Sequence, residues 1–329
     1  MNYSMDALLK DIKRISINDN DLKQYIELNL KSPYDQLKFK TLGNMLLSKG
    51  YLKYGYECYD KAIELDPKYV DAYNNKGVVL ELLERYSESI EFYNKAIELD
   101  PTYVHAYNNK GKAYGFLKQP EKAIDCYDKV IELDPKYVDA YYNKGLAYGS
   151  LEQYEEAIEC YDKAIELDPK YVDAYNNKSR INSYLQNYKE AIEGYDKAIE
   201  LDPKYVDAYN NKGIALQNLE QYEEAIECYD KAIDLDPKYM FAYYNKGITL
   251  HKLEKYEEAI KSYDKAISID PNDTYAYDNK GITLHKLEKY EEAIKSYDKA
   301  ISIDPNDTYA YDNKGITLHK LEKYEEAIK

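Results

Sequence analysis

The sequence predicts an all-α protein built from stacked helical hairpins, and a tandem repeat carries most of that prediction. An Asp-Pro dipeptide recurs with a period of 34 residues, its proline being Pro67, Pro101, Pro135, Pro169, Pro203, Pro237, Pro271 and Pro305. A fixed period of this length indicates stacked supersecondary units, none of which can bury its apolar face alone. The apolar core is therefore expected to be spread along an elongated array.

Unit 206–239 shows why each repeat is interpreted as helix, turn, helix. Its second half places apolar side chains on one helical stripe: Tyr222, Ala225, Ile226, Tyr229, Ala232 and Ile233. Intervals of three and four residues are those of one face of a helix. The first half repeats the pattern more narrowly. Pro237 ends the second helix because proline lacks an N–H donor and disfavours helical geometry at Asp236.

Seven positions of this unit match a known family pattern. Positions 4, 8, 11, 20, 24, 27 and 32 of the unit are Tyr209, Gly213, Leu216, Ala225, Tyr229, Ala232 and Pro237. This spacing resembles the tetratricopeptide repeat. The resemblance covers residues 36–329 and implies a right-handed α-α superhelix, a TPR solenoid whose first helices line a concave, peptide-binding face. The family's usual tryptophan at position 4 is tyrosine here.

The repeat divides the chain into three parts. Residues 1–35 match poorly and are expected to form a degenerate N-terminal capping hairpin. Eight full units follow: 36–69, 70–103, 104–137, 138–171, 172–205, 206–239, 240–273 and 274–307. Residues 308–329 form a partial ninth unit, which is expected to leave an apolar seam uncapped.

Individual residues predict how the hairpins pack. Gly213 is expected to allow close approach of the two helices of a hairpin. Tyr209 and Tyr229 are expected to fill the space between neighbouring helices and to keep a hydroxyl near the edge. Pro120 falls at the start of a second helix, where a missing donor is harmless.

Unit 172–205 departs most from the pattern. Ser179 replaces the glycine of position 8, and Asn182 replaces the Leu or Tyr of position 11. A polar amide that faces the core costs stability unless it finds partners. This unit is therefore predicted to be the weakest interior point of the array.

Composition excludes several classes of function. The formal net charge of −16 argues against nucleic acid and against an anionic membrane surface, because both need clustered Lys and Arg. No apolar run approaches the ~20 residues of a transmembrane helix. The N-terminal residues lack the apolar core of a signal peptide, so a cytoplasmic protein is expected.

No side-chain constellation for catalysis is found. The four cysteines, Cys58, Cys126, Cys160 and Cys228, all occupy position 23 of their units. Helices stack roughly 10 Å apart, which is beyond disulfide reach, so these are interpreted as packing residues in a reducing compartment. His251, His285 and His319 lie one repeat apart, too far to share a zinc ion. Neither enzyme activity, nor a cofactor, nor a metal is expected.

The candidate peptide-binding residues are the asparagines of position 6: Asn75, Asn109, Asn143, Asn177, Asn211, Asn245, Asn279 and Asn313. A side-chain amide can donate to and accept from a peptide backbone at once. The row resembles the asparagine ladder in the TPR domain of O-linked N-acetylglucosamine transferase. The alternative interpretation is that asparagine is simply frequent at this position of the family.

Position 2 adds charge to the same face. It is aspartate in the middle units, at Asp139, Asp173 and Asp207, and aromatic in the last ones. The three carboxylates are interpreted as selecting positively charged side chains, with an ordinary solvated face as the alternative.

A second family feature is the carboxylate clamp of some TPR co-chaperones. Lys40, Asn44 and Asn75 match three of its five positions, whereas His105 and Asn109 stand where cations are expected. Recognition of a terminal carboxylate is therefore not predicted.

The sequence thus predicts a non-catalytic scaffold for protein–protein interaction, binding an extended and possibly basic peptide in its concave groove. Two alternatives stay open. The chain could be the recruiting arm of a larger enzyme assembly, or a structural array that associates with itself through its uncapped C-terminal end.

Overall fold

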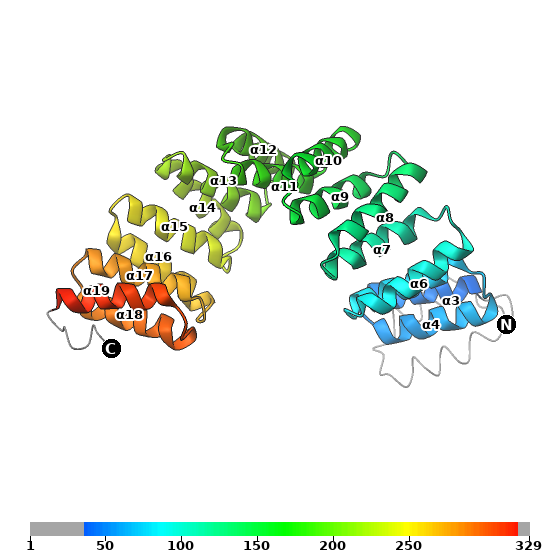
Figure 1. Ribbon diagram of the computed structural model, residues 1–329, viewed down its shortest axis with the longest axis horizontal. Coiled ribbons are helices and arrows are strands. Elements are labelled where there is room, and N and C mark those ends of the chain that lie inside the picture. Colours follow the sequence, from blue (N-terminus) through cyan, green and yellow to red (C-terminus); the bar gives the residue numbers. More distant parts are fainter. Residues whose placement is uncertain (1–35, 322–329) are drawn as a thin grey trace. The chain divides into compact units, whose positions relative to one another are not determined.

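The computed structural model describes residues 36–321, and the regular secondary structure of these residues is entirely helical, as predicted. Consecutive helices pair into hairpins (Figure 1). The chain divides into two compact units, one ending at Leu167 and the other beginning at Asp168. The expected capping hairpin of residues 1–35 and the end of the partial ninth repeat, residues 322–329, lie outside the described residues.

The first unit contains four hairpins. Their helices are α3 (Gln36–Ser48) with α4 (Leu52–Leu65), α5 (Val70–Leu82) with α6 (Tyr86–Leu99), α7 (Val104–Phe116) with α8 (Pro120–Leu133), and α9 (Val138–Ser150) with α10 (Tyr154–Leu167). Helix α8 begins at Pro120, which confirms that prediction. The missing N–H of Pro120 is harmless because the first turn of a helix has no intrahelical acceptor for it.

The second unit contains four more hairpins and one further helix. These are α11 (Val172–Tyr184) with α12 (Tyr188–Leu201), α13 (Val206–Asn218) with α14 (Tyr222–Leu235), α15 (Met240–Lys252) with α16 (Tyr256–Ile269), α17 (Thr274–Lys286) with α18 (Tyr290–Ile303), and α19 (Thr308–Lys320). Within each unit, every first helix after the initial one packs against the second helix of the hairpin before it.

The turn inside each hairpin uses one residue in the left-handed conformation. Its φ lies between 55° and 63° in seven repeats, at Glu84, Lys118, Glu152, Gln186, Glu220, Glu254 and Glu288. In the repeat of α5 and α6, the N–H of Arg85 donates to the carbonyl of Leu80 over 2.8 Å. This bond closes the first helix with the hydrogen-bonding pattern of a Schellman motif.

The connection between hairpins follows from the Asp-Pro dipeptide. Pro237 holds Asp236 in an extended conformation, with φ −136° and ψ 96°, and so ends α14 as predicted. The side chain of Asp236 then accepts a hydrogen bond from the N–H of Lys238 over 2.9 Å. The carbonyl of Asp236 accepts from the N–H of Tyr239, where the next repeat begins.

The core of every described hairpin except that of α11 and α12 is a tyrosine ring packed against a glycine. A Cβ atom placed on Gly213 would lie 2.5 Å from Cε1 of Tyr229, so only glycine fits at this contact. The close approach predicted for Gly213 is therefore confirmed. Tyr209 keeps its hydroxyl at the edge, where it donates to the carbonyl of Pro203. The same prediction for Tyr229 is wrong, because its side chain is fully buried and its hydroxyl has no partner among the described residues.

Two glycines of α7 provide a test of this contact. A Cβ on Gly111 would lie 2.6 Å from Cε1 of Tyr127, whereas a Cβ on Gly115 meets nothing within 4 Å. We expect Gly111→Ala to lower the free energy of unfolding by about 1–2 kcal/mol, because overpacking outweighs the helix propensity gained. Gly115→Ala should raise it by up to about 1 kcal/mol. Urea denaturation followed by circular dichroism measures both, and equal shifts for the two variants would contradict the packing argument.

The departures in unit 172–205 are buried, as expected. Ser179 is 1 % exposed and Asn182 is 9 % exposed. However, the serine at position 8 is matched by a glycine at position 23. A Cβ on Gly194 would lie 2.0 Å from Oγ of Ser179. The side chain of Ser179 therefore occupies the space that the larger residue at position 23 fills in neighbouring repeats.

Within each unit, ion pairs connect most second helices to the first helix that follows. They join Lys144 to Asp128 (2.5 Å), Lys212 to Asp196 (2.5 Å), Lys280 to Asp264 (2.6 Å) and Lys314 to Asp298 (2.6 Å). Partial burial lowers the pKa of Lys144, but the hydrogen bond to Asp128 outweighs it and the net pKa is raised. Ion pairs this exposed contribute ~0–1 kcal/mol each to the free energy of unfolding. Their main effect is therefore to favour one alignment of neighbouring helices over others.

Candidate functional site

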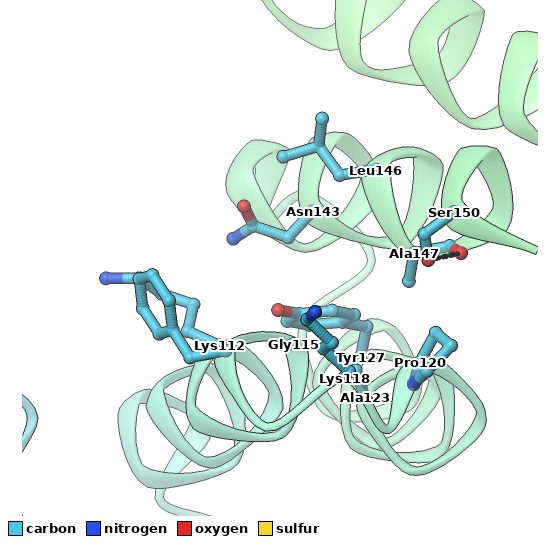
Figure 2. A pocket seen from close by; sticks show the side chains of 11 residues that line it. Lys112, Gly115, Lys118, Pro120, Ala123, Tyr127, Asn143, Leu146, Ala147 and Ser150 are labelled. Carbon is cyan, nitrogen blue, oxygen red and sulfur yellow. Dashed lines mark hydrogen bonds between the residues drawn. The ribbon is translucent and has the colours of Figure 1, made fainter. Parts of the chain in front are cut away.

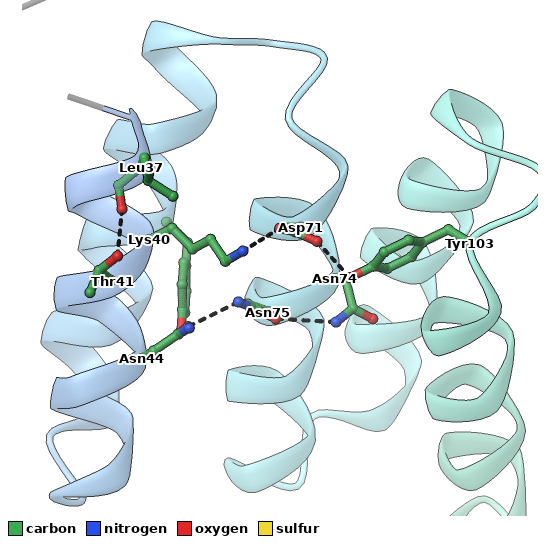
Figure 3. Close-up of polar contacts among 9 residues, drawn as sticks. Leu37, Lys40, Thr41, Asn44, Asp71, Asn74, Asn75 and Tyr103 are labelled. Carbon is green, nitrogen blue, oxygen red and sulfur yellow. Dashed lines mark hydrogen bonds and ion pairs between the residues drawn. The ribbon is translucent and has the colours of Figure 1, made fainter. Parts of the chain in front are cut away.

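The first helices carry the predicted binding residues, and within each unit polar side chains join neighbouring first helices. The surface formed by positions 2, 6, 9 and 13 of these helices is called the first-helix face below. At its start, Nδ2 of Asn75 donates to Oδ1 of Asn44 over 3.0 Å (Figure 3). Nδ2 of Asn74 donates to Oδ1 of Asn75 over 3.2 Å. Asn75 therefore links α3 to α5.

A second polar cluster lies beside these amides (Figure 3). Lys40 of α3 forms an ion pair with Asp71 of α5, and the hydroxyl of Tyr103 donates to Asp71 over 2.7 Å. Burial alone would raise the pKa of Asp71, but the hydrogen bonds from Lys40 and Tyr103 lower it below its usual value. Lys40, which matches a carboxylate-clamp position, is thus already neutralised by an aspartate of the chain.

The amide link recurs along both units. Each bond runs from Nδ2 of a position-6 asparagine to Oδ1 of the position-5 asparagine one repeat earlier: Asn109 to Asn74 (3.0 Å), Asn143 to Asn108 (3.3 Å), Asn211 to Asn176 (3.3 Å) and Asn245 to Asn210 (3.0 Å). The donors that the sequence assigned to a peptide backbone are therefore used to join repeats. A ligand that takes these donors has to replace a bond of the solenoid.

The remaining asparagines of position 6 have other surroundings. Asn177 is 8 % exposed. Nδ2 of Asn279 donates to the hydroxyl of Tyr244 over 3.1 Å and to the carbonyl of Tyr275 over 2.9 Å. Asn313 lies half-buried on α19. Sequence reasoning missed the position-5 acceptors, although the recurring Asn-Asn dipeptide was a visible signal.

The predicted aspartates lie exposed in the first turns of their helices. The hydroxyl of Tyr205 donates to Asp173 over 2.7 Å, and that of Tyr239 donates to Asp207 over 2.6 Å. Asp139 occupies the same place in α9. Burial and the neighbouring Asp207 raise the pKa of Tyr239, so this hydroxyl stays a donor at neutral pH. The aspartates are held in place by tyrosines that sequence reasoning did not connect to them.

An apolar pocket of about 700 Å³ opens on the first-helix face between α7 and α9. Figure 2 shows Asn143 and Leu146 of α9 on one side and Lys112 and Tyr127 on the other. Leu146 is 37 % exposed, so it offers apolar surface at the mouth. Nζ of Lys112 lies 3.5 Å from a carboxylate oxygen of Glu81, which partly neutralises the rim. This hollow is called the α7–α9 pocket.

Small residues at usually bulky positions explain the pocket. One repeat earlier, the ring of Tyr86 stacks on that of Phe116 with centroids 4.8 Å apart, which joins α6 to α7. The corresponding residues of the next pair are Pro120 and Ser150, and both line the pocket. The space that two rings fill between α6 and α7 is therefore left open between α8 and α9.

The cysteines and histidines take part in packing. Cys58, Cys126 and Cys160 are buried free thiols, and Cys228 is a half-buried one. Burial raises the pKa of Cys126, Cys160 and Cys228 to about 11, so these thiols are unreactive at neutral pH.

The histidine row bridges repeats. Nδ1 of His251 lies 2.8 Å from Oγ1 of Thr283, and His285 makes the same contact with Thr317. Within residues 36–321 no group of three His, Cys, Asp or Glu side chains is arranged to hold a metal ion. No helix in that range has both the length and the apolar character needed to cross a membrane.

Three family profiles match the chain. The tetratricopeptide repeat profile matches residues 70–103, 104–137, 138–171, 206–239, 241–273 and 275–307. A TPR repeat profile matches 43–84 and 184–220, and a second tetratricopeptide repeat profile matches 160–193 and 296–329. The first profile skips unit 172–205, the one that holds Ser179 and Asn182. No curated protein matches the sequence significantly.

Three solved structures are similar to the chain. YrrB, described as a TPR protein with an unusual peptide-binding site, is 29 % identical over 57 % of this chain and 96 % of its own, with a TM-score of 0.47. MamA is 28 % identical over 49 % of this chain and 95 % of its own, with a TM-score of 0.46. The APC/C hetero-tetramer Cut9–Hcn1 has a TM-score of 0.61 at 18 % identity, covering 91 % of this chain and 60 % of its own. That last likeness shows the α-helical solenoid fold, and the profiles cover most of the sequence. The chain belongs to the tetratricopeptide repeat family, whose repeats form scaffolds for protein–protein interaction.

Proposed function

We propose that this protein is a non-catalytic scaffold that binds an extended peptide segment of a partner protein along its first-helix face. The α7–α9 pocket carries the proposal, because it combines an apolar hollow with a ladder residue. An apolar side chain of the peptide enters the pocket, and Oδ1 of Asn143 at its wall accepts from a peptide N–H, while Nδ2 of Asn143 keeps its bond to Asn108. A concave apolar site with a few polar groups is the usual form of a specific anchor.

The exposed aspartates give the face its charge preference. Asp139, Asp173 and Asp207 attract Lys or Arg side chains of the same peptide, and chiefly raise the association rate and the specificity. Tyr205 and Tyr239 hold two of these carboxylates in fixed positions, so that less freedom is lost on binding.

A pocket-filling variant tests the anchor. We expect Pro120→Tyr combined with Ser150→Phe to rebuild the stacked pair seen at Tyr86 and Phe116, and so to close the pocket without harming the fold. Peptides selected from a random displayed library on the full chain serve as the probe, with fluorescence anisotropy as the measurement. Affinity should fall by about tenfold or more, the loss of one well-buried side chain.

Two further variants control this experiment. Leu65→Ser removes an exposed apolar residue of α4, a second helix outside the first-helix face, and should leave binding unchanged. Changing Asp139, Asp173 and Asp207 together to Asn should weaken only the peptides that contain Lys or Arg, and should flatten their salt dependence. If the selected peptides bind the filled variant as tightly as the wild type, the anchor is elsewhere and the proposal fails. Self-association, the competing role, would appear as a concentration-dependent sedimentation coefficient.

A further inference from the structure

A buried carboxylate in the second unit lacks a hydrogen-bond partner. At position 5, Asn210 accepts the amide of Asn245, but the corresponding residue of α17 is Asp278. Asp278 is only 5 % exposed, and its Oδ1 has no hydrogen-bond partner among the described residues. A buried acceptor left without a donor is costly, and a buried charge more so, which points to a missing cationic or protonated partner.

Two acidic side chains, Asp307 and Asp273, interact with this carboxylate. Asp307 caps the N-terminus of α19, accepting from the N–H of Ala310 over 3.1 Å, and Asp273 caps α17. The carboxyl group of Asp278 also interacts with that of Asp307. Burial, Asp307 and Asp273 together raise the pKa of Asp278 to about 7. Near neutral pH the cluster therefore holds a proton that a cation can displace.

Asp304 also lines the pocket, and two tyrosine hydroxyls that interact with Asp278 stay neutral. Tyr244 of α15 and Tyr297 of α18 both interact with its charge, and burial raises the pKa of Tyr244 to about 12 and that of Tyr297 further still. Any titration of this cluster between pH 5 and pH 8 therefore belongs to the carboxyl groups.

The cluster lies in a pocket of about 410 Å³ between α17 and α19. Tyr275 and Tyr309, at position 2 of successive repeats, line the pocket and are 70 % and 73 % exposed. The faces of tyrosine rings attract Lys and Arg side chains, and their edges cover the aliphatic stem. The pocket thus offers aromatic walls together with an acidic floor.

We propose that this pocket binds the cationic side chain of a lysine or arginine from a partner polypeptide. The charged head donates to Oδ1 of Asp278 and to Asp307, and the stem lies between the rings of Tyr275 and Tyr309. This inference rests on the proposed function for the origin of the ligand, but the pocket itself is testable without any peptide. Binding releases the shared proton, because the cation stabilises the ionised form of Asp278.

The probes are N-acetyl-L-arginine amide, N-acetyl-L-lysine amide and the neutral N-acetyl-L-citrulline amide, titrated into the full ¹⁵N-labelled chain. Amide resonances of α17 and α19 report binding. We expect both cationic amides to bind about tenfold more tightly than the citrulline amide. Affinity should rise from about pH 5.5 to a plateau near about pH 8, because protonated Asp278 competes with the ligand below its raised pKa.

Two variants separate the pocket from general acidity. Asp278→Asn places at position 5 of α17 the asparagine that α13 has at the same position, Asn210, so the variant should fold. Its affinity for the two cationic amides should fall about tenfold and should no longer depend on pH. Asp312→Asn changes the same position one repeat later, where the side chain is exposed, and should bind like the wild type. Equal binding of the citrulline amide, unchanged binding by Asp278→Asn, or displacement of both amides by Ca²⁺ would overturn the proposal. None of these outcomes depends on the α7–α9 pocket, so failure here leaves the peptide proposal standing.

Discussion

Tyr229→Ala is expected to lower the free energy of unfolding of the second unit by about 3–5 kcal/mol, the usual cost of removing a buried aromatic side chain. The ring is fully buried, and it packs with Leu216, Ala225, Ala232 and Ala242 in one apolar cluster. These neighbours are small and sit on rigid helices, so they cannot collapse into the space left behind. The decrease in the free energy of unfolding should therefore be among the largest that a single substitution causes.

Tyr229→Phe is the matched control for this substitution. It keeps the ring against Gly213 and removes only a hydroxyl that has no partner among the described residues. We expect a change of less than about 1 kcal/mol, in the stabilising direction. Urea denaturation gives the two free energies, and hydrogen exchange shows whether the loss spreads from α13 and α14 to their neighbours, as expected for repeats coupled to nearest neighbours. A large loss in Tyr229→Phe would mean that the hydroxyl, rather than the ring, holds the hairpin.

The sequence was sufficient to predict the helices because their signal is local and repeated. The apolar stripe of unit 206–239 and the proline at position 32 predict α13, α14 and the end of α14, and the structure has all three. The turn inside each hairpin was less visible. Its left-handed residue is Glu, Gln or Lys in seven repeats rather than glycine, so no composition signal marks the position.

The candidate site was harder to predict because its geometry depends on pairs of residues far apart in the chain. Position 6 was recognised as a row of asparagines, but five of their amides donate to a side chain 35 residues earlier, as in the bond from Asn245 to Asn210. The α7–α9 pocket depends on two small residues in different helices, Pro120 and Ser150. Neither residue is unusual by itself. Only the stacked rings of Tyr86 and Phe116, one repeat earlier, show that Pro120 and Ser150 stand where two aromatic side chains could pack.

The same reasoning applies to unit 172–205, where two departures were first considered separately. From the sequence, Ser179 was interpreted as a departure that weakens the repeat, and Gly194 was not connected to it. In the structure they touch, so one substitution makes room for the other. A compensated pair of this kind predicts strong energetic coupling between the two positions.

Gly194→Cys, which installs the cysteine found at position 23 of four other repeats, is accordingly expected to destabilise the second unit by about 2 kcal/mol. Its Cβ would lie 2.0 Å from Oγ of Ser179, and neither helix can move away without disturbing the stack. Adding Ser179→Gly restores the usual pair of glycine and cysteine, so the double variant should recover most of that loss. The double-mutant cycle is measured by urea denaturation, with Ser179→Gly alone as the fourth corner. If the two single changes simply add, the residues are not compensating each other, and the weakness of this repeat has to be assigned to Asn182.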